Sequence, residues 1–224
     1  MKNKTLWKQV GAAAIAAAMV MSTVPATPVQ AAGGKTLAVS SQKQLNQALK
    51  TVKGKNAVIT VKAGKNVKIT IPKGTYKVTI RVVGKKAAVV NNGTVKEIVV
   101  NSKGTVAIKN NGTIKKVTVQ NAKSVSFSGN HKKAVPVVVN AEDVSMILAA
   151  PAKITAKKDV NIVLKKGAEK SSITCTKNVQ AQVDNQTKKA ISVKIADGTT
   201  LKVESGESCT ITPKGKKEDT SGEE

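Results

Sequence analysis

Aromatic residues are nearly absent from this chain of 224 residues, which holds one tryptophan, one tyrosine and one phenylalanine. Proteins that bind single-stranded nucleic acid usually stack bases on aromatic rings, and so few rings exclude such a platform for bases or sugars. The interior must therefore be filled by Val, Ile, Leu and Ala. A high density of β-branched residues, with Lys and Thr between them, favours strands over helices. We expect a mostly β protein.

Histidine and arginine are equally scarce. His131 is the only histidine, which excludes a histidine-based catalytic triad and a metal site with several histidines. We expect His131 to lie in an exposed turn. Arg81 is the only arginine, so bidentate contacts to phosphates or base edges are almost excluded.

The N-terminal segment, residues 1–31, has the pattern of a cleavable export signal. Lys2, Lys4 and Lys8 precede an apolar run over residues 10–24, which is shorter than the roughly 20 residues that a membrane-spanning helix needs. Small side chains at residues 29–31 predict cleavage at the end of this segment. We therefore expect a secreted protein, extracellular or loosely associated with the cell wall, with no transmembrane anchor after cleavage.

A short amphipathic helix is predicted for residues 41–52. Leu45 and Leu49 stand at helical spacing, and Ser41 with Gln44 has the pattern of a capping box. Beyond this helix, runs of about five alternating residues bounded by Gly or Asn predict strands.

A repeat of about 19 residues organises the remaining chain. Residues 90–96 (VNNGTVK) recur as residues 109–115 (KNNGTIK), and the same shift matches Ile98 with Val117. Fixed periods of this length indicate a solenoid. We therefore predict an all-β protein, a single-stranded parallel β-solenoid (β-helix) over residues 32–212, with about eight coils of roughly 17–20 residues and the helix as its N-terminal cap.

The predicted architecture resembles a known family. A helix leading into the first strand at Val58, two-strand coils and asparagines at one coil position, Asn92, Asn111 and Asn130, are similar to the pectin-lyase-like right-handed parallel β-helix, particularly small secreted versions from Gram-positive anaerobes. The resemblance implies that these asparagines form a structural ladder in the turns. The predicted coil is shorter than that family's usual turn, so a left-handed helix and a two-sheet sandwich stay open.

Carboxylates give little support for catalysis. The acidic residues of the coils are scattered, and only Glu142 and Asp143 are adjacent. Projecting Asp143 forward by one repeat reaches Ile162, so we expect no column of carboxylates. We predict no catalytic residue, no metal and no cofactor.

The two cysteines and the C-terminus complete the predicted domain. Cys175 and Cys209 share strand parity with inward residues about two coils apart, whereas a disulfide needs Cα atoms within about 7 Å. We expect buried free thiols, with a bridge as the alternative.

Residues 213–224 offer no apolar side chain to bury, which predicts a disordered charged tail.

Lysine dominates the charge. The 38 basic residues, less three lysines of the signal, leave 35 against 13 acidic residues, a net charge of +22. Lys77, Lys96 and Lys115 follow one another at intervals of one repeat, and the same interval separates Lys62 from Arg81. Stacked coils would align such residues. The candidate binding residues are Lys62, Lys77, Arg81, Lys96, Lys115 and Lys133.

Aligned lysines favour a polyanionic partner, because like charges about 4.8 Å apart repel unless anions lie beside them. Anionic cell-wall polymers or acidic polysaccharide are the expected partners. Nucleic acid would be bound without specificity. The alternative is that outward lysines only keep the sheets soluble and block edge pairing.

Three functions remain open from the sequence. The first is a non-enzymatic surface or adhesin-like module that binds polyanions through the lysines. The second is an unusual polysaccharide-active β-helix enzyme, which is lyase-like. The third is a structural module that self-associates, because solenoids need capped ends and the last coil, ending near Ile211, has no evident cap.

Overall fold

The computed structural model describes residues 35–63, 66–213 and 217–219. They belong to one compact unit, residues 31–224. This unit is a mostly β solenoid of about eight turns with one short helix, as the sequence predicts. The predicted export signal, residues 1–31, lies outside the described residues. No helix in the described part of the chain has both the length and the apolar character to cross a membrane.

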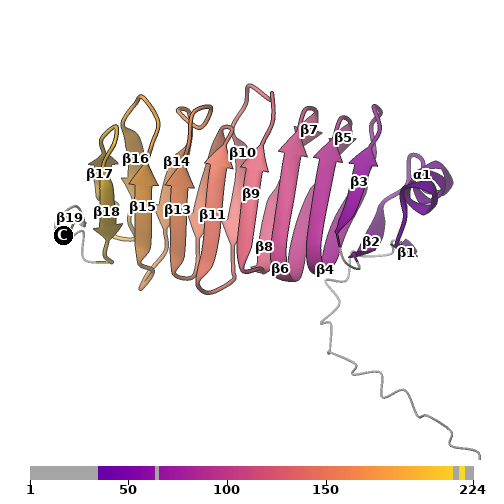
Figure 1. Ribbon diagram of the computed structural model, residues 1–224, viewed down its shortest axis with the longest axis horizontal. Helices are drawn as coiled ribbons and strands as arrows, with labels where there is room; N and C mark the ends of the chain where they lie inside the picture. Colours follow the sequence, from indigo (N-terminus) through magenta and orange to yellow (C-terminus); the bar gives the residue numbers. More distant parts are fainter. Residues whose placement is uncertain (1–34, 64–65, 214–216, 220–224) are drawn as a thin grey trace, which may run out of the picture. The chain divides into compact units, whose positions relative to one another are not determined.

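Two sheets face each other across the solenoid and are joined at every turn (Figure 1). The front sheet faces the viewer in Figure 1. It consists of β3 (Val67–Ile71), the second halves of β4 (Val78–Asn91) and β6 (Glu97–Asn110), β9 (Ser124–Ser128), β11 (Val144–Ala149), β13 (Val160–Leu164), β15 (Ala181–Asn185), β18 (Ser208–Ile211) and β19 (Lys217–Asp219).

The rear sheet is formed by the other strand of each coil. It consists of β1 (Lys35–Val39), β2 (Ala57–Ala63), the first halves of β4 and β6, β8 (Val117–Asn121), β10 (Val135–Val139), β12 (Ala152–Ala156), β14 (Ser172–Cys175), β16 (Ile191–Lys194) and β17 (Thr200–Val203). A third, two-stranded sheet joins β5 (Thr94–Val95) to β7 (Thr113–Ile114).

Alternation explains both the strands and the core. In β4 the buried Ile80 and Val82 alternate with partly exposed residues, as a period of two requires when one face is covered. Equivalent positions of successive coils then stack: Ile108 lies opposite Phe127, and Phe127 opposite Leu148. The coils therefore share one continuous apolar interior.

The helix α1 (Gln42–Thr51) closes the N-terminal end of the front sheet. Ser41 is its N-cap and accepts a hydrogen bond from the backbone N–H of Gln44, which confirms one half of the predicted capping box. The return bond differs, because Gln44 Oε1 accepts from the backbone N–H of Ser40 (2.7 Å) and not from that of Ser41. The side-chain amide of Gln42 bonds to both backbone groups of Thr70 in β3: the N–H of Thr70 donates to Oε1 (2.6 Å), and Nε2 donates to the carbonyl oxygen (2.8 Å).

The C-terminal end reverses direction, which corrects the expectation of an uncapped last coil. Strands β1 to β16 pair in parallel, but β17 runs antiparallel to β16 and β18 antiparallel to β15. Gly198 (φ +94°) and Gly206 (φ +79°) occupy turns of this reversed segment. Strand β19 adds a further antiparallel pair, so the expectation of disorder is wrong for residues 217–219.

The two cysteines lie in different sheets. Cys175 is in β14 of the rear sheet and Cys209 in β18 of the front sheet, so the sequence estimate of two coils between them on one face is wrong. Both side chains are buried, and Cys175 is a free thiol, so no bridge joins them. Burial raises the pKa of Cys175 to about 11, which keeps the thiol protonated near neutral pH.

Candidate binding surface

The corner between the third sheet and the rear sheet carries the lysines that the repeat aligns. A bridge joins Thr75 to Thr94, and Thr94 lies opposite Thr113. A lysine stands two positions beyond each threonine. We call Lys77, Lys96 and Lys115 the lysine ridge; all three side chains are exposed.

Backbone contacts hold this corner at the spacing of a parallel sheet. The N–H of Lys96 donates to the carbonyl oxygen of Val78 (3.0 Å), and that of Lys115 to Val95 (3.2 Å). A glycine lets the coils approach: a Cβ on Gly93 would lie 2.5 Å from the carbonyl oxygen of Pro72. Lys96 and Lys115 therefore lie on coils about 4.8 Å apart and in register. Between Lys77 and Lys96 the register slips by one residue, since Thr75 pairs with Thr94 but Thr79 with Glu97.

The ridge has no acidic counterpart in the described part of the chain. Two ion pairs occur there, Lys116–Glu97 (3.4 Å) and Lys158–Glu142 (2.7 Å), and neither involves the ridge. Glu97 also accepts a hydrogen bond from Thr118 Oγ1 (2.6 Å), so its carboxylate is held toward the next coil along. The positive charge of the ridge is left for a partner or for solvent counter-ions.

The other predicted binding residues do not continue the ridge. Lys62 lies opposite Val83, and Arg81 lies between Thr60 and Val99, so the predicted column of Lys62 and Arg81 is wrong. Both side chains point to the outer face of the rear sheet as diagonal neighbours. The pairing of Ala57 with Val78 shows the reason, because the step between these two coils is longer than the repeat.

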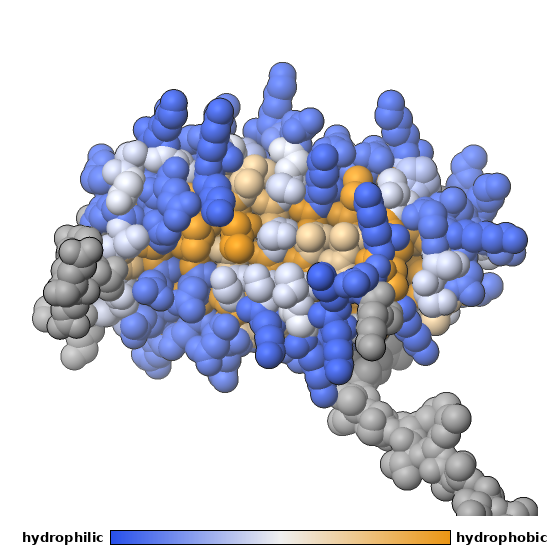
Figure 2. All heavy atoms as spheres, viewed as in Figure 1, coloured by the Kyte–Doolittle hydropathy of each residue, from blue (hydrophilic) through white to orange (hydrophobic). Residues whose placement is uncertain are grey.

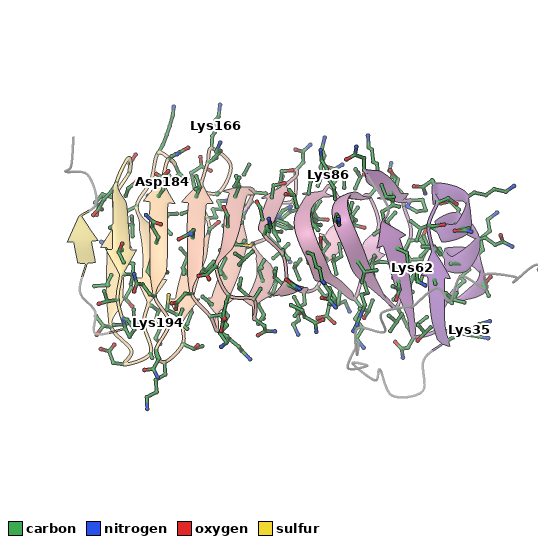
Figure 3. The ribbon with its side chains drawn as sticks, turned by 60° about the horizontal axis from the view of Figure 1, so that its bottom comes forward. Lys35, Lys62, Lys86, Lys166, Asp184 and Lys194 are labelled. Atoms are coloured by element: carbon green, nitrogen blue, oxygen red, sulfur yellow. The ribbon has the colours of Figure 1, made fainter. Side chains whose placement is uncertain are left out.

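Lys133 is exposed, but it lies in the loop between β9 and β10. Val117 pairs with Val137, again a step longer than the repeat, which puts Lys133 out of line with Lys115. The aligned ridge therefore spans three coils. Lysines elsewhere, such as Lys62, Lys166 and Lys194, project outward from the coils (Figure 3).

An asparagine ladder exists, one residue earlier than predicted. Asn91 and Asn110 are fully buried, and Nδ2 of Asn91 donates to Oδ1 of Asn110 (2.8 Å) and to the carbonyl oxygen of Gly93 (2.9 Å). The predicted pair also meets, since Nδ2 of Asn111 donates to Oδ1 of Asn92 (3.0 Å), but this bond is at the surface.

Asn130 is not the third rung. Its side chain is exposed, and only its backbone N–H reaches the ladder, donating to the carbonyl oxygen of Asn110 (3.1 Å).

His131 follows Asn130, and the expectation that it is a solvent-exposed turn residue is wrong. Its ring is half-buried against Phe127, with centroids 5.2 Å apart, and its nitrogens lie 3.2 Å from the carbonyl oxygen of Asn110 and 3.0 Å from that of Pro151.

A hollow of about 510 Å³ beside α1 was missed by the sequence analysis. Its walls come from α1 and from the turn that leads into the ridge, and they include Lys50, Lys53, Lys73 and Tyr76. The tyrosine hydroxyl donates to the carbonyl oxygen of Lys73 (3.3 Å). Lys50 near the end of the predicted helix and Lys53 just beyond it were the available signal, but both are far in sequence from the turn at Lys73.

Carboxylates do gather at one set of turns, which corrects the projection by one repeat. Val144 pairs with Val160, a step shorter than the repeat, and the N–H of Asp143 donates to the carbonyl oxygen of Asp159 (3.1 Å). Glu142, Asp143 and Asp159 line one hollow of about 360 Å³ together with three lysines. The ammonium of Lys158 hydrogen-bonds Glu142 and lowers the pKa of that carboxyl. Among the described residues no three acidic, histidine or cysteine side chains are placed to hold a metal ion.

No protein-family model, curated protein or solved structure matches the chain. Function must therefore be inferred from the solenoid and from the geometry of its surface.

Proposed function

We propose that the chain is a non-enzymatic, secreted surface or adhesin-like module that binds anionic polymers of the cell envelope, or another acidic polysaccharide, through the lysine ridge. One observation carries the proposal: three exposed lysines, each two residues after a paired threonine, recur on successive coils and have no carboxylate partner among the described residues. The export signal predicted from residues 1–31 would deliver the protein to a compartment rich in such polymers.

Electrostatics supports a long, flexible anion over a compact one. Ammonium groups about 4.8 Å apart repel one another, and a polymer with regularly spaced negative charges relieves this repulsion at every coil. Lysine acts as a point charge without the fork geometry of arginine, so selectivity among polyanions should be weak. Binding should weaken as salt screens the charges.

The hollow beside α1 extends the positive surface past Lys77. Lys50, Lys53 and Lys73 line it, together with Thr75 and Tyr76 of the turn from which the ridge begins. A polymer lying along the ridge would reach these lysines as well. Lys62, Arg81 and Lys133 add positive charge elsewhere on the coils and are auxiliary in this proposal.

Retention on purified bacterial cell walls tests the ridge. The wild-type protein should sediment with the walls at low salt and be released at about 0.5 M salt. The triple variant K77E/K96E/K115E should lose most of this retention. The matched control K153E/K188E/K202E changes the same net charge at exposed positions away from the ridge and should keep most of it. Equal loss in both variants would show that net charge, not the ridge, causes the binding.

The resemblance to right-handed pectin-lyase-like β-helices carries a second candidate function, cleavage of acidic polysaccharide. The hollow of about 360 Å³ with Glu142, Asp143 and Asp159 is the observation in its favour. Lys158 pairs with Glu142 there, which makes this carboxylate a poor general acid. Incubation with acidic glycans and calcium, followed by chromatography of the products, separates the two functions: cleavage abolished by D143N would favour the enzyme.

A further inference from the structure

The outer face of the front sheet carries a row of side chains that is unlike the rest of the surface. Strand register stacks five small or aliphatic residues at equivalent outward positions of β4, β6, β9, β11 and β13: Ala88, Ala107, Ser126, Ile147 and Val163. All five are partly exposed. Figure 2 shows this row as an apolar band across the face, with hydrophilic side chains on both sides. We call it the front row.

Opposite charges stand at the two ends of the front row. Lys68 in β3 lies opposite Ala88, and Asp184 in β15 lies opposite Val163. Neither forms an ion pair with another described residue. Lys86 and Asp184, both labelled in Figure 3, lie toward opposite ends of this sheet.

Side-chain size also changes along the front row: small residues lie at its positive end and larger residues at its negative end. The two alanines lie next to Lys68, and a hollow of about 250 Å³ opens over them, lined also by Val67 and Lys86. The larger Ile147 and Val163 lie on the other side of Ser126, next to Asp184. The row is thus small and positive at one end, and bulky and negative at the other.

We propose that this face binds a second copy of the same chain, with a two-fold axis parallel to the strands at Ser126. That rotation reverses the order of the coils and leaves the strand direction unchanged. Lys68 then faces the partner's Asp184, and Ala107 faces the partner's Ile147. The bulky end of each copy enters the hollow over the alanines of the other, which is the self-complementarity that an isologous interface requires.

Neighbouring lysines are compatible with this arrangement. At the rims, Lys86 comes opposite the partner's Asn161, and Lys109 opposite the partner's Ala149, because the same reversal of coil order applies. No lysine of these rows faces a lysine. A two-fold axis along the stack would instead place Lys68 on the partner's Lys68, which the proposal excludes.

Charge reversal tests the dimer. Sedimentation velocity and light scattering of the purified protein at physiological salt should show a monomer–dimer equilibrium in the micromolar range. K68E would put two carboxylates face to face at each end, D184K two ammonium groups, and each should weaken the dimer by at least about tenfold. The swapped variant K68E/D184K restores opposite charges and should recover the dimer.

Controls separate this interface from other effects. K43E reverses a charge on α1 and K153E reverses one on the exposed face of the rear sheet, and both should leave the dimer intact. A107R should abolish the dimer while circular dichroism stays unchanged. A strict monomer in the wild type, or failure of the swap to recover what both single variants lose, would overturn the proposal. Retention on cell walls by the ridge is measured separately, so either proposal can fail alone.

Discussion

Buried amides are the most specific polar feature at the residue scale. Asn91 follows the inward parity of Ala87 and Val89 in the second half of β4, and it therefore brings an amide into an otherwise apolar interior. Its hydrogen bonds to Asn110 and to the carbonyl oxygen of Gly93 satisfy groups that water cannot reach. The adjacent asparagines of these two coils, Asn91–Asn92 and Asn110–Asn111, conceal this arrangement, because the sequence does not say which of the two points inward.

Replacing the inner asparagine should cost far more than replacing an outer one. In N91A the acceptor oxygens of Asn110 and Gly93 lose their donor, which should lower the free energy of unfolding by about 2 kcal/mol. N111A removes a chemically similar bond at the surface and should cost less than about 0.5 kcal/mol. Urea unfolding followed by circular dichroism measures both. Equal losses would mean that the ladder has no special role.

At the scale of elements, α1 protects the first strand of the front sheet. Edge strands expose unpaired backbone groups that can recruit another chain. Gln42 occupies such groups on Thr70 with its side-chain amide, which has the same donor and acceptor as a peptide. The helix thus continues the hydrogen bonding of the sheet without adding a strand.

Loss of this amide should loosen the N-terminal coil. Q42A leaves the N–H and carbonyl of Thr70 without these partners, and we expect a loss of about 1–2 kcal/mol in stability. Hydrogen exchange of the Thr70 amide should quicken in the same variant. Q47A, at an exposed position of the same helix, is the matched control and should change neither quantity. A Thr70 amide equally protected in both variants would contradict the assignment.

For the solenoid as a whole, the repeat predicted the architecture but not the register. Period and alternation are properties of every coil, so errors at single turns leave the fold unchanged. The register at any coil, however, depends on every insertion and deletion in the coils before it. The pairing of Val144 with Val160 marks a short coil, and that of Val160 with Ala181 marks a long one directly after it. Contacts predicted by a fixed step therefore failed where the coil length departs from the repeat, as for Lys62 with Arg81.

The alignment of Lys96 with Lys115 was predicted correctly for the same reason. Lys96 and Lys115 lie where the step equals the repeat, as the pairing of Val95 with Ile114 shows. The reversal at the C-terminus had no signal in the pattern, because alternation is the same for parallel and antiparallel strands. Hollows between distant segments, such as the one at Tyr76, were likewise beyond a repeat analysis.

Reversed strands should keep the solenoid from growing end to end. A chain ending at residue 196 lacks β17, β18 and β19, and so leaves β15 and β16 as open parallel edges. We expect assemblies larger than a dimer in light scattering, because the open C-terminal edges of two copies can pair while the front row still joins each copy to another. A chain ending at residue 212 loses only β19 among the described strands and should associate as the wild type does. Absence of larger assemblies in the shorter chain would contradict this role.

Because both ends are closed by their own elements, the number of coils between them could change without affecting either end. Coils between α1 and the reversed strands contact only their neighbours, so a duplicated repeat such as residues 96–114 could be inserted without altering either end. Each insertion would add one lysine to the ridge and about 4.8 Å to its length. Tandem duplication thus offers a genetic route to higher valence, in which the strength of attachment to a polymer is set by counting coils.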